Sequence, residues 1–379
     1  MRIIVLGAGY TGMTAAMRAW QKTHKRGGQV TLVNPSPRFT ERLRLHQTAA
    51  GERLADHLIE DVVAGTGITF VQGRVTAIDP EAREVTVDGD RTLGYDRLVY
   101  AIGTVTDTWS TPGVADHAYT YDDHDQAVRL AARLDGLREG TVVVAGGGLT
   151  GVESATELAE AHPGLRVVLL SRAVPGSMMG ERARAYLSRV MDGLGIEVRS
   201  GVEVAKVLPG GVELVGGEFV AAEATLWTAG TRALPLAADA GLTVDARGRV
   251  VVDEVLRSVS HPDVYAVGDA AAVSQPYGTI HGTCQSGIPT GLHAGDALGA
   301  EARGKDPKPF RFGYFHQPLS LGRKDGVIQF VRRDDTPRRW YITGRWAIAY
   351  KEMVSSSPLP SLNLIRRGLV PSWAFRLTA

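Results

Sequence analysis

The chain contains 379 residues, of which 44% are hydrophobic and 22% charged, and its formal net charge is +1. This composition is typical of a soluble globular protein with two or three domains, and it gives no general case for nucleic acid as a partner. The sequence holds no apolar run of the roughly 18 residues that a membrane-spanning helix needs. Because a strand pattern follows Met1 directly, we expect no signal peptide and a cytoplasmic location.

Cys284 is the single cysteine of the chain. An intramolecular disulfide and a redox-active pair of thiols are therefore excluded, and we expect a buried or half-buried thiol. The ten histidines are scattered along the sequence, and one cysteine cannot form a thiolate site, so we expect no bound metal.

The first 34 residues follow the pattern of a strand, a glycine turn, a helix and a second strand. The predicted pieces are an apolar strand over 3–6, the fingerprint Gly7-Ala8-Gly9-Tyr10-Thr11-Gly12, a helix over 11–23 and a strand over 30–33. Glycines at this spacing let the backbone approach a pyrophosphate, and the helix start directs N–H groups at it. A strand–turn–helix without a ligand is the structural alternative.

The same order recurs from Thr141. The pieces are a strand over 142–145, the fingerprint Gly146-Gly147-Gly148-Leu149-Thr150-Gly151, a helix over 150–161 and a strand over 167–170. Each unit continues with a predicted meander, over 67–99 and over about 196–220, and then a strand, over 98–100 and 224–227. The repeat indicates two dinucleotides in one chain, and electron transfer is the usual reason for holding both.

Further elements follow the second unit. We predict a hairpin over 245–253, a strand over 263–267 that ends in Gly268-Asp269 and leads into an alanine-rich helix, and a helix over 283–299. Pro289 is expected in the first turn of that last helix or at a kink. Short strands, basic residues and late prolines set residues 313–379 apart as a C-terminal region.

These motifs resemble those of the two-dinucleotide-binding-domain flavoproteins, the pyridine-nucleotide-dependent oxidoreductases, over about residues 1–310. The N-terminal fingerprint, Ala101-Ile102-Gly103 and Gly268-Asp269 carry the resemblance. It implies an α/β fold with two Rossmann-like three-layer domains, antiparallel meander insertions and a small C-terminal region. The implied divisions are an FAD-binding domain over 1–113 and 245–312, an NAD(P)-binding domain over 114–244, and the C-terminal region over 313–379.

Within that family the chain is most similar to the type II NADH:quinone dehydrogenases. The segments that carry this similarity are Leu45-His46-Gln47, Ala49-Ala50-Gly51, Gly148-Leu149-Thr150-Gly151-Val152-Glu153 and Trp227-Thr228-Ala229-Gly230. Four features depart from the pattern. Asn34 replaces the acidic residue expected at the FAD ribose, Ile102 replaces threonine, and Cys284-Gln285-Ser286-Gly287 is only partly the expected glutamine-rich quinone segment. The C-terminal region is also short for the membrane-bound members of the family.

The resemblance implies the cofactor-binding residues. For FAD they are Gly7, Gly9, Tyr10, Thr11, Gly12, Asn34, Arg42, Ala101, Gly103, Gly268 and Asp269. For NAD(P)H they are Gly146, Gly148, Thr150, Gly151, Glu153, Ser171, Arg172 and Gly230. Asp269 has a helix N-cap as its alternative role. An NADH site normally has a carboxylate after its second strand, whereas Ser171 and Arg172 suit a 2′-phosphate, so we expect NADPH to be accepted at least as well as NADH. A solvent-facing arginine after the strand is the structural alternative for Arg172.

Three residues are candidates for catalysis. By resemblance Glu153 faces the nicotinamide and the flavin, with helix capping as the alternative. His46 lies along the flavin as a proton donor or as a packed histidine. By resemblance Gln285 and His281 lie at the substrate-side helix, and either residue is a candidate to hydrogen-bond a quinone carbonyl. A purely structural role is the alternative for both.

Residues 338–379 contain seven basic residues and one acidic residue, a net charge of +6. The basic residues are Arg338, Arg339, Arg345, Lys351, Arg366, Arg367 and Arg376, against Glu352, and Trp340, Trp346, Trp373 and Phe375 lie between them. This mixture suits an anionic membrane surface on the inner face of the cell membrane. A tail packed on the flavin domain or across a homodimer is the alternative, and Pro358, Pro360, Gly368 and Pro371 exclude one long amphipathic helix.

The sequence therefore predicts an FAD-dependent enzyme that oxidises NAD(P)H and passes electrons to a quinone-like acceptor. Two alternatives remain at this point. One is a reductase of a biosynthetic intermediate or of a small electron-carrier protein, and the other is a flavin-bearing redox sensor.

Overall fold

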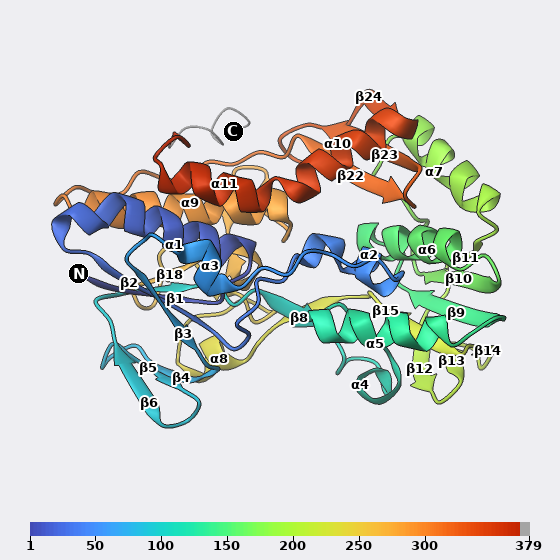
Figure 1. Cartoon of the computed structure of the whole chain (residues 1–379), viewed down its shortest axis with the longest axis horizontal. Coiled ribbons are helices and arrows are strands. Elements are labelled where there is room, and N and C mark those ends of the chain that lie inside the picture. Colours follow the sequence, from blue (N-terminus) through green and yellow to red (C-terminus); the bar gives the residue numbers. More distant parts are fainter. Residues whose placement is uncertain (372–379) are drawn as a thin grey trace.

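The structure, a computed structural model, describes residues 1–371, which build two α/β units joined beneath a C-terminal layer (Figure 1). The first unit contains a five-stranded parallel sheet in the order β18-β7-β1-β2-β3. Its strands are Val264–Ala266 (β18), Arg97–Tyr100 (β7), Arg2–Leu6 (β1), Gln29–Asn34 (β2) and Ile68–Gln72 (β3). The central strand is apolar and buried from Ile3 to Leu6, as a strand covered on both faces must be.

The second unit contains a four-stranded parallel sheet in the order β11-β10-β9-β15. Its strands are Glu197–Ser200 (β11), Leu165–Ser171 (β10), Gly140–Ala145 (β9) and Ala224–Trp227 (β15), and its main helices are His124–Asp135 (α5), Leu149–Ala161 (α6) and Glu181–Gly193 (α7). Both sheets with their flanking helices confirm the predicted fold class. The sheets lie inside the ranges predicted for the two domains, while the boundary residues themselves stay a prediction.

Each unit carries a three-stranded antiparallel meander. The strands are Val75–Asp79 (β4), Glu84–Val87 (β5) and Arg91–Gly94 (β6) in the first, and Val204–Leu208 (β12), Gly211–Leu214 (β13) and Phe219–Ala221 (β14) in the second. Both meanders are shorter than predicted. Their predicted first strands, β3 and β11, pair instead in register with the parallel sheets, because the apolar pattern of a short strand does not state which sheet it joins.

The glycine turns follow from close approaches of the backbone. A Cβ on Gly12 would lie 1.9 Å from the backbone O of Gly7, and a Cβ on Gly151 would lie 1.7 Å from that of Gly146. Gly7 and Gly146 also take φ values of +94° and +123°, which side chains rarely allow. The same steric requirement therefore shapes the strand–helix turn in both units.

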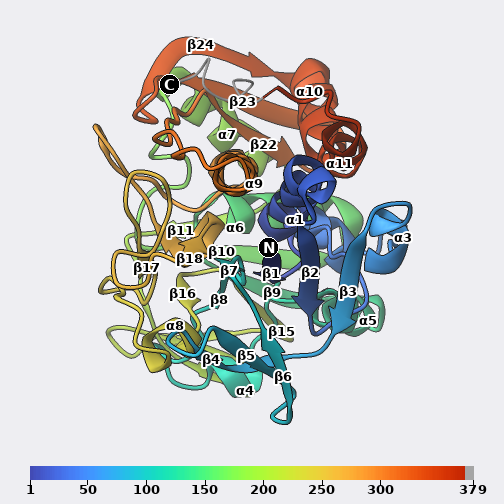
Figure 2. The same ribbon diagram turned by 90° about the vertical axis from the view of Figure 1, so that its left-hand side faces the viewer.

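A row of glycines lets the long helix Cys284–Glu301 (α9) pack closely on Tyr10–Thr23 (α1), the helix that follows the first glycine turn (Figure 2). The row is Gly287, Gly291, Gly295 and Gly299, spaced four residues apart on one face. A Cβ on Gly291 would lie 2.4 Å from the backbone O of Thr11. Pro289 lies inside α9 beyond its first turn, and a Thr283–Ser286 capping box starts the helix.

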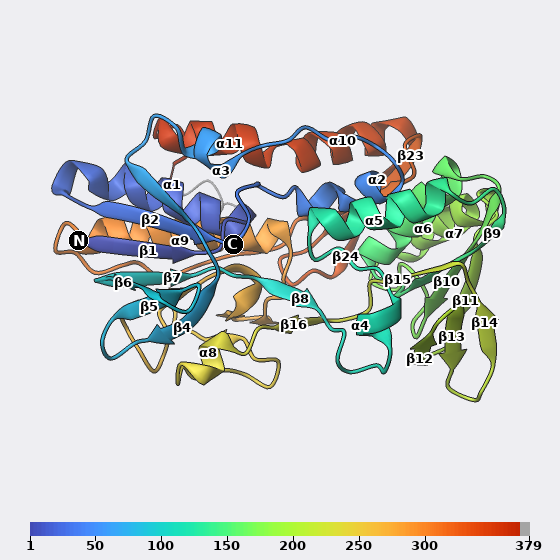
Figure 3. The same ribbon diagram turned by 60° about the horizontal axis from the view of Figure 1, so that its bottom comes forward.

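The chain crosses between the units along two paired strands. These are Thr104–Thr106 (β8) and Thr231–Ala233 (β16), which form an antiparallel pair at the junction (Figure 3). The shorter elements are Leu45–Ala49 (α2), Ile59–Val63 (α3), Val114–His117 (α4), Leu236–Asp239 (α8), Ser274–Gln275 (β20), Gly278–Thr279 (β21) and the 3-10 turns His24–Arg26 and Arg42–Arg44.

Two predictions around residues 245–271 need correction. Asp269 does not start a helix, because Gly268–Ala270 forms a 3-10 turn and Ala271–Ala272 (β19) continues as a strand. That strand pairs with Val250–Val251 (β17), so tertiary pairing overrides the helix preference of alanine. The predicted hairpin over 245–253 is shorter than expected: its turn is closed by a single bridge between Val244 and Val250, and the other edge of β17 pairs with β19.

The C-terminal region folds into a sheet and two helices. The elements are His316–Leu321 (β22), Asp325–Val331 (β23), Pro337–Thr343 (β24), Gly344–Ser356 (α10) and Pro358–Arg366 (α11), and the strands are antiparallel. Strand β22 packs on α6, while α11 packs on α1, so this layer covers both units. Trp373, Phe375 and Arg376 of the basic tail lie outside the described residues. Within residues 1–371, no helix combines the length and apolar character needed to span a bilayer.

We expect Gly291→Ala to lower the free energy of unfolding by about 1–3 kcal/mol, because its methyl group would overlap the backbone of α1. Gly193→Ala is the matched control, since a Cβ at this glycine at the end of α7 meets no atom within 4 Å. The control variant should gain up to about 1 kcal/mol from helix propensity. Chemical unfolding of both variants measures the difference, and an equally stable Gly291→Ala protein would contradict the packing argument.

Candidate active site

Both glycine turns leave their middle glycine facing open space. Gly9 and Gly148 are the N-caps of α1 and α6, in extended conformation and without a side-chain cap. A Cβ on either glycine would meet no protein atom within 4 Å. Packing of the chain therefore does not require glycine at these two positions, whereas a pyrophosphate lying on the helix start does. The residues present fit a dinucleotide at each turn.

Around the first turn, the predicted FAD residues come together at the carboxyl edge of the sheet. A Cβ on Gly7 would lie 2.5 Å from the backbone O of Ala101, so the two loops touch. The Asn34 Oδ1 accepts a hydrogen bond from the Ala8 N–H at 2.9 Å, and its Nδ2 donates to the Ser36 carbonyl. Asn34 thus holds the glycine loop against β2 with the amide that replaces the usual acid.

Other predicted FAD residues complete this edge. Tyr10 is buried with its ring edge on Phe39 at 5.3 Å between centroids, and Gly103 has a φ of +70°. The Thr11 side chain lies against Gly268 and Gly287, where a Cβ on either glycine would come within 3 Å of the Thr11 Oγ1.

Asp269 and Arg42 bring opposite charges to the same region. Burial raises the pKa of the Asp269 carboxyl, and the nearby cations Arg42 and Arg249 lower it in part. Arg42 donates to the Thr104 carbonyl at 2.8 Å and pairs with Asp122 at 3.2 Å, so it ties residues 42–44 to the crossing strands. A half-buried carboxyl in a 3-10 turn is suited to accept hydrogen bonds from a ligand.

The second turn is lined by the predicted NAD(P)H residues. The Thr228 Oγ1 donates to the carbonyls of the turn at 3.1–3.2 Å, and Gly230 has a φ of +80°. Thr150 is exposed on the first turn of α6. Ser171 is buried beneath the turn, while Arg172 projects outward and its guanidinium lies 3.6 Å from Glu203.

A buried ion pair forms the centre of the site. The Lys351 Nζ on α10 lies 2.9 Å from the Glu153 Oε1 on α6, and both side chains are less than 10% exposed. The same oxygen accepts hydrogen bonds from the Ser320 N–H at 3.0 Å and the Ser320 Oγ at 2.9 Å. Burial works to raise the pKa of Glu153, but Lys351, His46 and Ser320 together hold it below its ordinary value. Glu153 is therefore ionised at neutral pH.

His46 lies within electrostatic reach of this pair. Burial lowers the pKa of its imidazole to about 4, although the Glu153 charge acts in the opposite direction. Its Nε2 is buried and finds no hydrogen-bond partner among residues 1–371. A neutral imidazole with an unpaired nitrogen is able to bind a ligand or a water molecule. The structure thus brings two of the predicted catalytic residues, His46 and Glu153, to one place.

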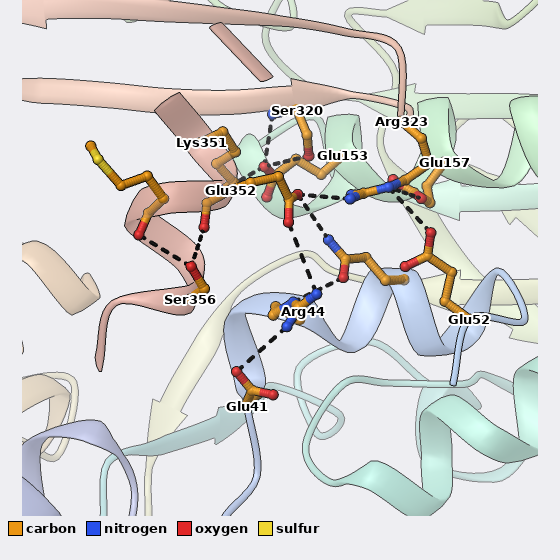
Figure 4. A network of polar contacts seen from close by, with 12 residues as sticks. Glu41, Arg44, Glu52, Glu153, Glu157, Ser320, Arg323, Lys351, Glu352 and Ser356 are labelled. Atoms are coloured by element: carbon orange, nitrogen blue, oxygen red, sulfur yellow. Dashed lines mark hydrogen bonds and ion pairs between the residues drawn. The ribbon is translucent and has the colours of Figure 1, made fainter. Parts of the chain in front are cut away.

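A second set of charges surrounds Arg323, which lies in the turn between β22 and β23 (Figure 4). One of its partners, Glu157, is one helical turn beyond Glu153 on α6. The Arg323 guanidinium contacts Glu352 at 2.8 Å, Glu52 at 3.2 Å and Glu157 at 3.7 Å. Burial raises the pKa of the Glu157 carboxyl to about 8, and Arg323 offsets only part of that rise. These contacts join residues of both units to the C-terminal layer.

Gln285 lies in the first turn of α9 with its amide already bound to the backbone. Its Nε2 donates to the His316 carbonyl at 2.7 Å and its Oε1 accepts from the Phe315 N–H at 2.9 Å. These contacts favour a positioning role for Gln285. Cys284 beside it is half-buried, and burial raises the pKa of its thiol to about 12. His281 stacks on Tyr314 and lies 3.3 Å from Asp335.

An aromatic groove is lined in part by Phe315, whose N–H donates to Gln285. It has a volume of about 610 Å³ and is lined by Phe315, Phe330 and Trp340, with the basic side chains Arg333 and Arg338 at its wall. His316 lies beneath Phe315 and its Nδ1 is 2.7 Å from the Tyr350 hydroxyl. The groove is therefore apolar, with positive charge at its edge.

Sequence reasoning missed Lys351, Ser320 and Arg323. Lys351 was counted as one cation of the basic tail, although its side chain is only 7% exposed. Lys351 sits in α10 between Ala347 and Ser355, the other buried residues of that helix, at a spacing of four residues. This periodicity, rather than the overall charge, was the signal that placed it on the inner face.

The fold and the two glycine turns define an oxidoreductase that binds two dinucleotides. Residues 1–294 match the family model described as pyridine nucleotide-disulphide oxidoreductase, and the chain belongs to this family. An NADH dehydrogenase-like protein of Mycobacterium tuberculosis is 36% identical, with 99% of this chain and 98% of the relative covered. A type II NADH:quinone oxidoreductase of Staphylococcus epidermidis is 26% identical, with 95% and 96% covered.

Solved structures agree on the fold. A sulfide:quinone oxidoreductase of Aquifex aeolicus superposes with a TM-score of 0.83 at 19% identity, covering 99% of this chain and 94% of that one. The predicted family is confirmed, and the chain is an NAD(P)H oxidoreductase related to the type II NADH dehydrogenases. FAD and NAD(P)H follow from this family as its cofactors. The single cysteine excludes a disulphide within this chain.

The pKa of Glu157 predicts a pH dependence of stability that Glu157→Gln removes. Between its ordinary value of 4.5 and the folded value of about 8, the folded chain keeps a proton that the unfolded chain has released. The free energy of unfolding therefore falls as the pH rises through this window, by up to about 1.4 kcal/mol per pH unit. Glu157→Gln should flatten this slope.

Chemical unfolding of the wild-type and variant proteins from about pH 5 to about pH 8 measures the effect. Glu139→Gln is the control, because Glu139 is exposed, and its curve should run parallel to that of the wild-type protein. Parallel curves for Glu157→Gln and the wild-type protein would show that the Glu157 carboxyl titrates normally.

Proposed function

We propose that the chain is an FAD-dependent NAD(P)H:quinone oxidoreductase. The observation that carries this proposal is the buried Lys351–Glu153 pair, which joins the helix of the second glycine turn to the C-terminal layer. The family and the relatives named as NADH dehydrogenase-like and as type II NADH:quinone oxidoreductase support it.

FAD is assigned to the first turn and NAD(P)H to the second. Gly9 and the start of α1 would hold the FAD pyrophosphate, with Asp269 and the Ala101–Gly103 loop beside it. Gly148 and the start of α6 would hold the nicotinamide dinucleotide. When bound, FAD accepts a hydride from NAD(P)H and passes two electrons to the acceptor.

Lys351 supplies a proton to the acceptor in this proposal. Its ammonium has three N–H bonds, and the Glu153 carboxylate and the Pro318 carbonyl at 3.5 Å use two of them among the described residues. The third is free to donate to a developing oxyanion. Glu153 orients the Lys351 ammonium through their ion pair. The nearby His46 is neutral because burial lowers its pKa, so it adds no second positive charge.

A quinone is the acceptor that the surroundings suit. Reduction of a quinone to a hydroquinone takes two electrons and two protons. The hydride of NAD(P)H brings both electrons and one proton, and Lys351 would supply the other proton. The groove at Phe315, Phe330 and Trp340 offers apolar surface for a ring or a hydrocarbon chain. Gln285 would fix the wall of that groove through the backbone of residues 315 and 316.

Anaerobic stopped-flow tests the function. The yellow protein is mixed with NADH or NADPH and then with a soluble menaquinone analogue, while the visible flavin absorbance is followed. We expect fast bleaching and fast recovery in the wild-type protein. Bleaching with slow recovery would point to another acceptor, a biosynthetic intermediate or a carrier protein. A long-lived reduced complex with every acceptor would favour a redox sensor, and no bleaching would overturn the enzyme assignment.

The double variant Glu153→Gln/Lys351→Met sharpens this test, because it removes both charges and leaves neither buried alone. Loss of the proton donor should slow the quinone-driven recovery about a hundredfold. Equal recovery in the variant and the wild-type protein would remove Lys351 from the proposed role.

We also propose that the C-terminal helices rest on an anionic membrane, in which the quinone is dissolved. The support is the exposure of Trp346 and Met353, seven residues apart on α10, and of Leu364 and Leu369 further along, with the Arg345 guanidinium over the Trp346 ring. Trp346→Ser should weaken sedimentation with anionic vesicles at low salt several-fold. Phe219→Ser, an exposed aromatic on β14, is the control and should not change it. A wild-type protein that stays in the supernatant would refute this contact.

A further inference from the structure

Arg172 and Glu203 are brought together at the carboxyl edge of the second sheet. Arg172 directly follows β10 and Glu203 lies three residues past β11, the neighbouring parallel strand. The Val202 N–H donates to the Ser171 carbonyl at 3.1 Å, which fixes the two segments side by side. Ligands of open parallel sheets bind at this edge.

The segment that carries Arg172 lies directly under the second glycine turn. A Cβ on Gly147 would lie 2.1 Å from the Ser171 Oγ and 3.4 Å from the Pro175 Cγ. The Ser171 Oγ donates to the Ala173 carbonyl at 2.6 Å, so the local backbone has a fixed shape. Arg172 therefore starts next to the turn, and its side chain extends 79% exposed from a defined position.

The only ion pair found for the Arg172 guanidinium within the described residues is with Glu203, at 3.6 Å. Glu203 is itself 58% exposed, and an ion pair this open to water contributes little to stability. A phosphate carries more charge than a carboxylate and binds a guanidinium through two hydrogen bonds. A phosphate on the adenosine ribose is therefore able to replace Glu203 as the ion-pair partner of Arg172. The bound phosphate would then lie near the Glu203 carboxylate, which repels it.

We propose that Glu203 sets the dinucleotide preference by competing with the 2′-phosphate of NADPH for the Arg172 guanidinium and by repelling that phosphate. This inference rests on the proposed placement of NAD(P)H at the second turn. Arg172 attracts the 2′-phosphate, while Glu203 limits the advantage of NADPH over NADH. Cofactor preference is thus decided by two exposed charges rather than by the acidic residue that NADH sites normally carry after the second strand.

The test compares Glu203→Gln, Arg172→Ala and the double variant as holoproteins. Calorimetry gives Kd for NADP⁺ and NAD⁺, and stopped-flow gives the rates of flavin reduction by NADPH and NADH. Glu203→Gln should shift the NADP⁺/NAD⁺ affinity ratio about two- to fivefold toward NADP⁺ at low salt. Because both charges are exposed, the shift should shrink at high ionic strength, which a merely structural change would not produce. In the Arg172→Ala background, Glu203→Gln should have a smaller effect.

Glu218→Gln is the matched control, since Glu218 is an exposed carboxylate of the same unit whose partner is Arg199 at 2.7 Å. It should leave the affinity ratio unchanged. An unchanged ratio in Glu203→Gln, or a shift that salt does not reduce, would overturn the inference even where both dinucleotides bind and reduce the flavin. Failure of the wild-type protein to bind either dinucleotide would instead overturn the proposed function, and the inference with it.

Discussion

The buried contact between Lys351 and Glu153 is the interaction on which the site depends. A buried charge is tolerated only when it has a partner. Removing one member of a buried ion pair leaves the other charge unpaired away from water, which strongly destabilises the folded state. Lys351 belongs to the C-terminal layer and Glu153 to the helix of the second glycine turn, so the site is complete only when that layer is docked. Ser320 adds two hydrogen bonds to the same carboxylate oxygen and fixes its orientation.

The fold uses the same glycine turn between strand and helix in both units. Gly7 and Gly146 turn the chain from a central strand into a helix, and Gly12 and Gly151 let that helix approach the turn. The first helix is held from its other side by the glycine face of α9. Both helix starts are thereby placed at carboxyl edges of their sheets, where backbone N–H groups are free to hold phosphate.

The Arg323 cluster shows how the parts are joined around that core. Its three carboxylates are Glu52, which follows α2, Glu157 on α6 and Glu352 on α10, and they lie far apart in the sequence. Glu157 is buried in this cluster, and burial raises the pKa of its carboxyl, which therefore keeps its proton to a higher pH than an exposed glutamate. Such a cluster favours one arrangement of the three parts, because each separated carboxylate or guanidinium would need a new partner.

The sequence by itself determined the two fingerprints, the internal repeat, the family and most strands and helices of the units. These depend on glycine spacing and on apolar periodicity, both of which are local. Tertiary structure alone decided that β3 and β11 join the parallel sheets, that Ala271–Ala272 is a strand, and that Lys351 is an inner residue rather than part of a solvated tail. It also decided which carboxylate faces Arg172. The physical reason is the same in each case: pairing and burial depend on a partner from a distant part of the chain, and a local pattern does not name that partner.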